Sequence, residues 1–157
     1  AVFSNAALHW MLEPEKVIGG VNKALKKNGR FVAEMGGDGN IAALLKAMSA
    51  VFKDNPDFGE FNTPWYFPDI ATYSNLLAQG GFTVESIDLI PRPTPLKSGL
   101  LKWLEIFADG ITAQLSSRQK RLFLTAVEAR LTADLYSEQE GWVADYVRLR
   151  FKAIKHE

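Results

Sequence analysis

Two short apolar segments and the amphipathic stretch between them constrain the fold of this chain most. Residues 1–5 and 30–35 are short and largely apolar, as buried strands are, and residues 14–28 carry apolar side chains at the 3.6-residue spacing of a helix. Pro14 suits the first turn of this helix, and Gly29 stands where a C-cap glycine is expected. The order strand, helix, strand predicts a parallel βαβ unit over 1–35.

The rest of the chain alternates further helical and extended patterns, which predicts a single α/β domain over 1–157. An aromatic-rich stretch without helical periodicity, residues 53–67, is predicted to be a long ordered loop that could act as a lid. After the first unit we expect a helix plus the lid loop at 36–67, a helix and a strand at 68–90, a helical insertion at 91–141 and a final strand at 142–157.

Composition narrows the classes of function. Lys and Arg together number 18, as do Asp and Glu, so no attraction to nucleic acid or to an anionic membrane is predicted. The chain has no Cys and two His, which excludes disulfides, thiolate ligands and a Cys nucleophile and predicts no metal site. With no bilayer-spanning apolar run and no visible signal peptide, we expect a cytoplasmic protein.

Seven short motifs follow one another in an order that one known family also has. They are Val2–Trp10 (VFSNAALHW), Glu13–Glu15 (EPE), Leu25–Phe31 (LKKNGRF), Thr63–Pro68 (TPWYFP), Gly80–Phe82 (GGF), Arg92–Leu96 (RPTPL) and Asp145–Phe151 (DYVRLRF). In this order they resemble class I S-adenosylmethionine-dependent methyltransferases, and most of all the group of trans-aconitate and malonyl-carrier-protein methyltransferases. The resemblance implies a partial domain over 1–157, the C-terminal half of a Rossmann-like sheet, with strands in the spatial order 4-5-7-6 and helical insertions. It also implies that the final strand at 142–157 is antiparallel.

Two family features are absent from the sequence. No Gly-x-Gly-x-Gly turn is present, and neither is the acidic residue that holds the cofactor ribose; the run Gly36–Gly39 follows a different strand and is predicted to be a turn. The chain alone is therefore expected to be a truncated, inactive domain. The strand at 1–5 would lack its neighbour in the family sheet, and such an open edge predicts self-association.

The resemblance also assigns roles at the ends of the first strand. It implies that Ser4 and Asn5 lie against the methionine part of S-adenosylmethionine, and that His9 and Trp10 face the methyl group and the substrate. His9 is the candidate catalytic general base, and the alternative is a structural loop histidine. Trp10 is a candidate substrate-binding residue that could equally serve in packing.

Four further residues are predicted to bind substrate. Glu34 ends the second strand and could accept a hydrogen bond from the substrate or be a solvated carboxylate. Trp65 and Tyr66, together with the adjacent Phe67, could close over the site as a lid or fix the loop to the sheet as a hydrophobic plug. Arg92 follows the third strand and could bind a substrate carboxylate or lie on the surface.

Two classes of function are consistent with these observations. The first is a methyltransferase fragment that acts on a small-molecule acceptor, and the second is a non-catalytic methyltransferase-like module for binding or assembly. An unrelated α/β ligand-binding domain is a third alternative, in which the motif matches are coincidental. Arg148, Arg150 and Lys152 alternate along the final strand and are predicted to be its solvated face, which is too small for a nucleic-acid footprint.

Overall fold

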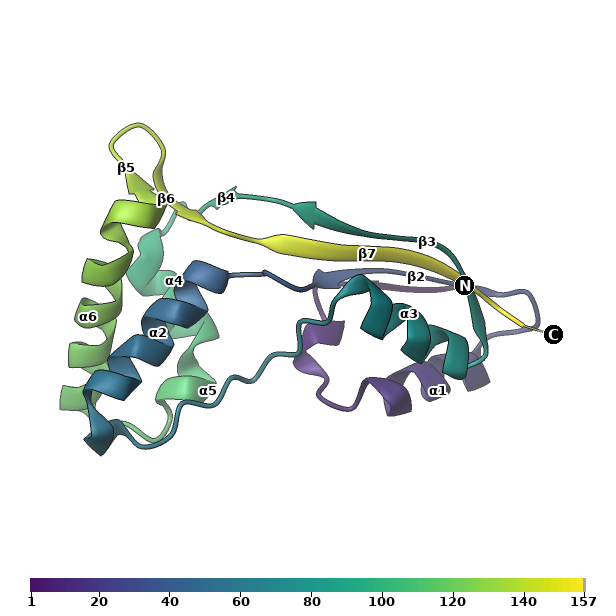
Figure 1. Ribbon diagram of the computed structural model, residues 1–157, viewed down its shortest axis with the longest axis horizontal. Helices are drawn as coiled ribbons and strands as arrows, with labels where there is room; N and C mark the ends of the chain where they lie inside the picture. The colour runs from purple at the N-terminus through teal and green to yellow at the C-terminus, as the bar shows by residue number, and fades with distance from the viewer. Residues whose placement is uncertain (157) are drawn as a thin grey trace. The chain divides into compact units, whose positions relative to one another are not determined.

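The computed structural model describes residues 1–156, which divide into two compact units (Figure 1). Unit one contains Ala1–Asn40, Trp65–Arg92 and the C-terminal segment from Tyr146. Unit two contains Ile41–Pro64 and Pro93–Asp145. Helices and strands occur in both units, and the predicted α/β class is confirmed.

Unit one is built on a four-stranded mixed sheet in the order β1-β2-β7-β3. Its first two strands are parallel and joined by α1, whereas β7 runs antiparallel to both β2 and β3. The bounds are β1 Val2–Asn5, α1 Pro14–Ala24, β2 Arg30–Gly36, α3 Ile70–Gln79, β3 Phe82–Pro91 and β7 Val147–Lys155.

One face of this sheet carries the hydrophobic core of the unit. Because side chains alternate along a strand, every second residue of β2 and β7 is buried on this face. Helices α1 and α3 supply the other side of the core. Asp69 starts α3 by accepting a hydrogen bond from the Thr72 amide at 2.7 Å. Buried members of the core include Ile18, Phe31, Met35, Tyr73, Leu77, Phe82, Leu149 and Phe151.

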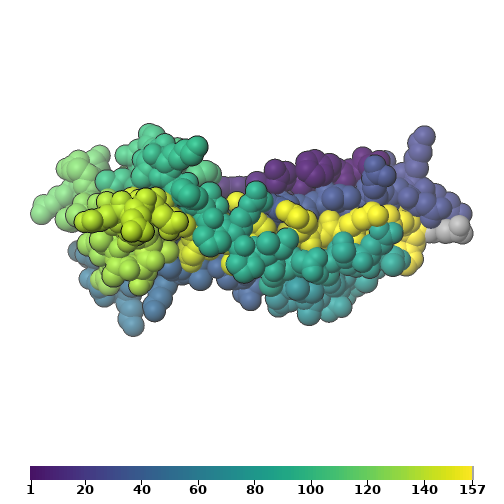
Figure 2. Space-filling view, turned by 90° about the horizontal axis from the view of Figure 1, so that it is seen from above, coloured from purple at the N-terminus to yellow at the C-terminus, as the bar shows by residue number. Residues whose placement is uncertain are grey.

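The opposite face of the sheet lies at the surface of unit one. Figure 2 shows strands there with no helix over them. Phe3 of β1 is 73% exposed on this face, and Arg150 and Lys152 of β7 are exposed as well. A sheet with one covered face and one solvated face is ordinary for antiparallel strands but leaves Phe3 without apolar cover.

The helix predicted for 14–28 is shorter in the structure. It ends at Ala24, and the residue with a positive φ is Asn28, at 59°, instead of Gly29. The cause lies far away in sequence, since the Lys155 ammonium donates to two carbonyls of the last turn at 2.7 and 2.9 Å. These bonds satisfy helix-end carbonyls that a C-cap glycine turn would otherwise satisfy.

Unit two is mainly helical. Its small sheet has the order β4-β6-β5, and α6 begins with a capping box in which Ser116 and Gln119 bond each other's backbone amides. No helix among residues 1–156 combines the length and apolarity needed to cross a membrane. The bounds are α2 Ala42–Asp54, η2 Pro56–Phe58, β4 Thr94–Pro95, α4 Gly99–Phe107, α5 Asp109–Thr112, α6 Ser117–Leu135, β5 Tyr136–Ser137 and β6 Gly141–Ala144.

The final strand predicted over 142–157 is interrupted, which corrects the prediction. The strand β6 ends at Ala144, and β7 begins only at Val147. Between them, Asp145 binds the start of α2: its carbonyl accepts from the Ile41 amide at 3.0 Å, and its Oδ2 accepts from the Ala43 amide at 2.7 Å. A residue used to cap a helix in this way cannot also continue a strand ladder.

Candidate functional site

The candidate site lies in unit one, where β1 and β2 end. The two strands are parallel, so their carboxyl ends meet at one edge, and the Ala6 amide bonds the Glu34 carbonyl there at 2.8 Å. The short 3₁₀ helix η1, Leu8–Trp10, follows directly. Ligands of open α/β sheets bind beyond the carboxyl ends of their strands, so this edge is where a ligand is expected.

His9 is held in one orientation by the end of β2. The side chain is only 7% exposed, and its Nδ1 accepts a hydrogen bond from the Gly36 amide at 3.1 Å. A backbone amide can only donate, so Nδ1 carries no proton, and the neutral ring must carry its proton on Nε2. Among residues 1–156, Asp145 Oδ1 is a fully buried side-chain atom without a hydrogen-bond partner, and Nε2 of His9 is not such an atom.

The charge state of His9 follows from the same environment. Burial, and to a lesser extent the positive charge of Arg148, lowers the pKa of His9 from 6.5 to about 4. The ring is therefore neutral near pH 7 and presents an N–H. This arrangement suits a hydrogen-bond donor and disfavours the general-base role predicted from the sequence, because the unprotonated nitrogen is already occupied.

Four rings surround this position and form what we call the aromatic cluster: His9, Trp10, Trp65 and Phe67. The His9 ring centroid lies 5.7 Å from that of Trp10 and 5.8 Å from that of Phe67. Trp10 meets Trp65 edge-on at 5.5 Å, and Trp65 stacks on Phe67 at 6.1 Å. Such spacings are those of favourable aromatic pairs.

Trp65 and Tyr66 are packed against the rest of unit one. Trp65 is 8% exposed, and the Tyr66 amide donates to the His9 carbonyl at 2.9 Å. Tyr66 also packs on the core of the unit, and burial, with Glu15 and Asp69, raises the pKa of its hydroxyl. In the structure the end of the predicted lid loop is thus fixed in place, as a hydrophobic plug would be.

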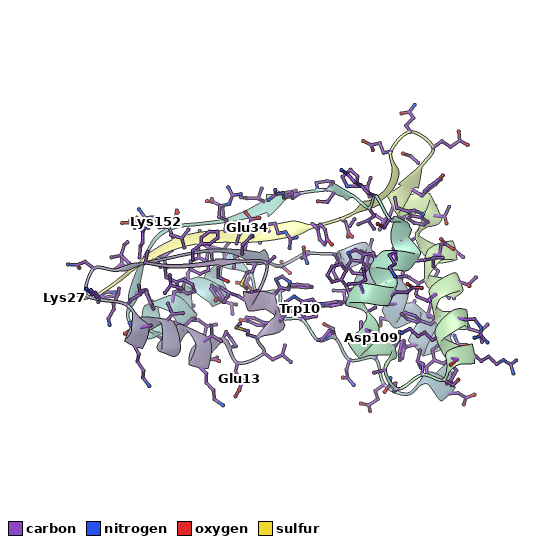
Figure 3. All side chains as sticks on the ribbon, turned by 180° about the vertical axis from the view of Figure 1, so that it is seen from behind. Trp10, Glu13, Lys27, Glu34, Asp109 and Lys152 are labelled. Carbon is purple, nitrogen blue, oxygen red and sulfur yellow. The ribbon has the colours of Figure 1, made fainter. Side chains whose placement is uncertain are left out.

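Glu34 and Arg92 were each predicted to bind substrate, but in the structure they bind one another. Glu34 lies on the face of the sheet away from α1 and α3, the same side as Lys152 (Figure 3). Its Oε1 accepts from Arg92 Nη1 at 2.8 Å. Its Oε2 accepts from Arg150 Nε and Nη2 at 2.8 and 2.6 Å. Arginines therefore bind both carboxylate oxygens of Glu34. Glu34 and Arg92 form an ion pair and cannot be treated as two independent substrate ligands.

The chain that carries this site is similar to known methyltransferases in sequence and in fold. The chain is 34% identical to an uncharacterized methyltransferase of Schizosaccharomyces pombe, over 98% of this chain and 62% of that protein. Among solved structures, loganic acid methyltransferase with SAH superposes with a TM-score of 0.60 at 14% identity, over 99% of this chain and 61% of the other. A proposed methyltransferase from Bacillus halodurans gives a TM-score of 0.57 at 14% identity, over 99% and 69%. No protein-family model matches the chain.

The chain has the class I methyltransferase fold. The two solved structures establish this at the level of fold, and the yeast relative extends the likeness along the sequence. The chain spans 62% of the length of that relative.

Within this methyltransferase fold, Ser4 and Asn5 occupy the end of β1. Neither side chain makes a hydrogen bond to another described residue, and Asn5 is exposed. Trp10 follows them on η1 and is 42% exposed. These three side chains are the part of the edge that a bound ligand could contact directly.

The sequence placed Phe67 in the loop that could close over the site, but it did not mark Arg148 as a site residue. Phe67 lies over Gly36, since a Cβ at this glycine would fall 2.5 Å from the Phe67 ring. Arg148, assigned to a solvated row, is half-buried, influences the pKa of His9 and stacks on Tyr146. The register of β7 against β2 places Arg148 opposite Gly36, but that register is not readable from a single strand pattern.

Proposed function

We propose that this chain supplies the acceptor-side part of an S-adenosylmethionine-dependent methyltransferase that acts on a small molecule. The supporting observation is a buried, oriented histidine and an aromatic cluster at the carboxyl ends of β1 and β2, in a chain with this fold. We further propose that β1, β2, β7 and β3 correspond to strands four, five, seven and six of the family sheet.

The residues at the strand ends fit one part of the cofactor. Ser4 and Asn5 offer unengaged polar groups, and the half-open Trp10 ring offers a surface that favours a sulfonium cation through cation–π attraction. S-adenosylmethionine supplies an activated methyl group when bound. The glycine turn that cradles the rest of such a cofactor does not occur in the 157 residues, so we expect the chain by itself to bind weakly and to be inactive.

We propose that the chain positions the methyl acceptor and excludes water from the site. Methyl transfer needs the acceptor atom held in line with the methyl group, in a site from which water is excluded. The aromatic cluster would provide the wall, and the Nε2–H of His9 would orient the acceptor by donating to it. Glu34 and Arg92 would act as a pair that shapes the rim, with Trp65 and Tyr66 holding the wall in place.

The test is calorimetric titration with S-adenosylhomocysteine. A protein of the length of the yeast relative should bind in the micromolar range, whereas the 157-residue chain should bind more weakly than about 1 mM. In the longer protein, Asn5→Ala should weaken binding about tenfold by removing a direct contact, and Asn75→Ala, on the exposed side of α3, should not. Failure of the longer protein to bind would refute the proposal and favour a non-catalytic module.

Location and partners follow as parts of the same proposal. We place the protein in the cytoplasm, with a small-molecule substrate and neither nucleic acid nor membrane as a partner. The support is the formal net charge of zero and the lack of cysteines.

A further inference from the structure

The three basic side chains that alternate along β7 are not equivalent. Arg150 is bound through two nitrogens to Glu34, and Lys152 is paired with Glu85. The side chain of Arg148 makes no ion pair or hydrogen bond with any described residue. Its contact is with a ring: the guanidinium carbon lies 4.5 Å from the centroid of Tyr146.

Arg148 is also the least exposed of the three. It is half-buried, while Arg150 and Lys152 are exposed. A guanidinium removed from water normally has a carboxylate or carbonyl to receive its five N–H donors. In residues 1–156, no side-chain nitrogen of Arg148 is both fully buried and without a partner. Because these nitrogens have no protein partner, they must be accessible to solvent.

The neighbouring carboxylate of Glu34 makes no direct bond to Arg148. Both oxygens of Glu34 are occupied, Oε1 by Arg92 and Oε2 by Arg150. Arg92 and Arg150 thus share this carboxylate, whereas Arg148 is under its electrostatic influence without bonding to it. Burial lowers the pKa of Arg148, while the charges of Tyr146 and Glu34 act in the opposite direction.

Arg148 also lies next to the proposed acceptor wall. It is opposite Gly36 in the ladder between β2 and β7, and opposite residues project to the same face of a sheet. Gly36 is the residue whose amide binds His9 and whose surface is covered by Phe67. The free guanidinium and the oriented histidine therefore flank the same glycine.

We propose that Arg148 binds the carboxylate of the methyl acceptor. The fork of a guanidinium matches the two oxygens of a carboxylate, and the single positive charge of Arg148 suits a monoanion better than a phosphate dianion. The Tyr146 ring covers one side of this guanidinium. The identification of the anion as the acceptor rests on the proposed function, whereas binding of a carboxylate by Arg148 does not.

The experiment uses benzoate as the probe, with neutral benzamide and phenyl phosphate as matched ligands. Each is titrated into the isotopically labelled protein without methyl donor, following the Arg148 Nε–Hε resonance and the Gly36 amide by NMR. Benzoate should shift both resonances saturably, benzamide should shift neither, and phenyl phosphate should bind more weakly than benzoate. Equal binding of benzamide, or stronger binding of phenyl phosphate, would overturn the assignment.

Substitutions distinguish specific binding of the carboxylate by the Arg148 guanidinium from general electrostatic attraction. Arg148→Gln should weaken benzoate binding about tenfold or more, and Arg148→Lys should weaken it less because the charge remains. Lys152→Gln removes the same charge from the same face and should change the affinity less than about twofold. If Lys152→Gln and Arg148→Gln weaken binding equally, the effect is electrostatic attraction and the proposal fails. Because no methyl donor is present, this outcome is independent of S-adenosylhomocysteine binding.

Discussion

The Gly36 amide donates a hydrogen bond to Nδ1 of His9, with 3.1 Å between the two nitrogens. This one bond joins the end of β2 to the 3₁₀ helix that follows β1, and it fixes the ring orientation and tautomer of the only histidine in the site. His9 then offers Nε2–H as a donor and has no free nitrogen for a proton. A general base for the reaction, where an acceptor needs one, must come from elsewhere.

The depressed pKa of His9 predicts a pH-dependent stability. The folded-state pKa of about 4 lies below the reference value of 6.5, so the unfolded chain binds a proton that the folded chain refuses. The stability contributed by neutral His9 is complete above pH 6.5 and is lost as pH falls toward 4. We expect the free energy of unfolding to be about 2 kcal/mol lower at pH 5 than at pH 7.5, as measured by urea denaturation.

The matched variants are His9→Gln and His156→Gln. Gln keeps an oxygen that can accept from Gly36 but does not titrate, so His9→Gln should abolish most of this pH dependence. His156 is exposed near the C-terminus, and its replacement should leave the loss due to His9 in place. An unchanged slope in His9→Gln would show that the loss arises from other groups.

The close approach of Phe67 to Gly36 predicts that Gly36→Ala is costly. The added Cβ would lie 2.5 Å from Phe67 Cε1 and 2.8 Å from Asn40 Nδ2, so the ring must move. We expect a loss of about 1–3 kcal/mol in unfolding free energy, with altered Trp fluorescence as the cluster shifts. Gly19→Ala is the control: nothing lies within 4 Å of its Cβ inside α1, so it should stabilise by about 0.5–1 kcal/mol.

Much of the fold could be predicted because it depends on burial, which leaves a periodic trace in sequence. Phe31 and Met35 are buried in β2, which the short, largely apolar segment 30–35 predicted as a strand. The errors arose where a distant residue decides a boundary. Lys155 satisfies the end of α1, and Asp145 leaves the strand to cap α2 across 102 positions, which no local pattern encodes.

The sequence predicted where the candidate site lies, but it did not predict which of its charged residues bind one another. That His9 and Trp10 follow a strand was enough to locate them at the edge where ligands bind. The bonds of Glu34 to Arg92 and Arg150 depend on strand register, with partners 58 and 116 residues away. For the same reason the distinction between paired Arg150 and unpaired Arg148 could not be seen in the alternation of β7.

Asp145 should be the residue of unit two most sensitive to substitution at a helix end. Asp145→Ala removes the acceptor of the Ala43 amide and should cost about 1–2 kcal/mol, read from the urea midpoint. Asp145→Asn should cost less than half of this, since an amide oxygen can accept the same bond. Asp134→Ala, at an exposed position on α6, should stay within about 0.5 kcal/mol. Equal losses for Ala and Asn would contradict the capping role.

The outer edge of β1 carries the last prediction. Phe3 is 73% exposed, and β2 is the only described strand that pairs with β1, so backbone groups and an aromatic ring are both open to a second chain. We expect the 157-residue chain to self-associate in sedimentation experiments at tens of micromolar and Phe3→Lys to shift it toward monomer, because a charged edge resists strand pairing. Ile106→Lys, at a 57% exposed position on α4, tests whether any added charge has this effect. A monomer at every concentration, with the amides of 1–5 protected from hydrogen exchange, would exclude association through this edge.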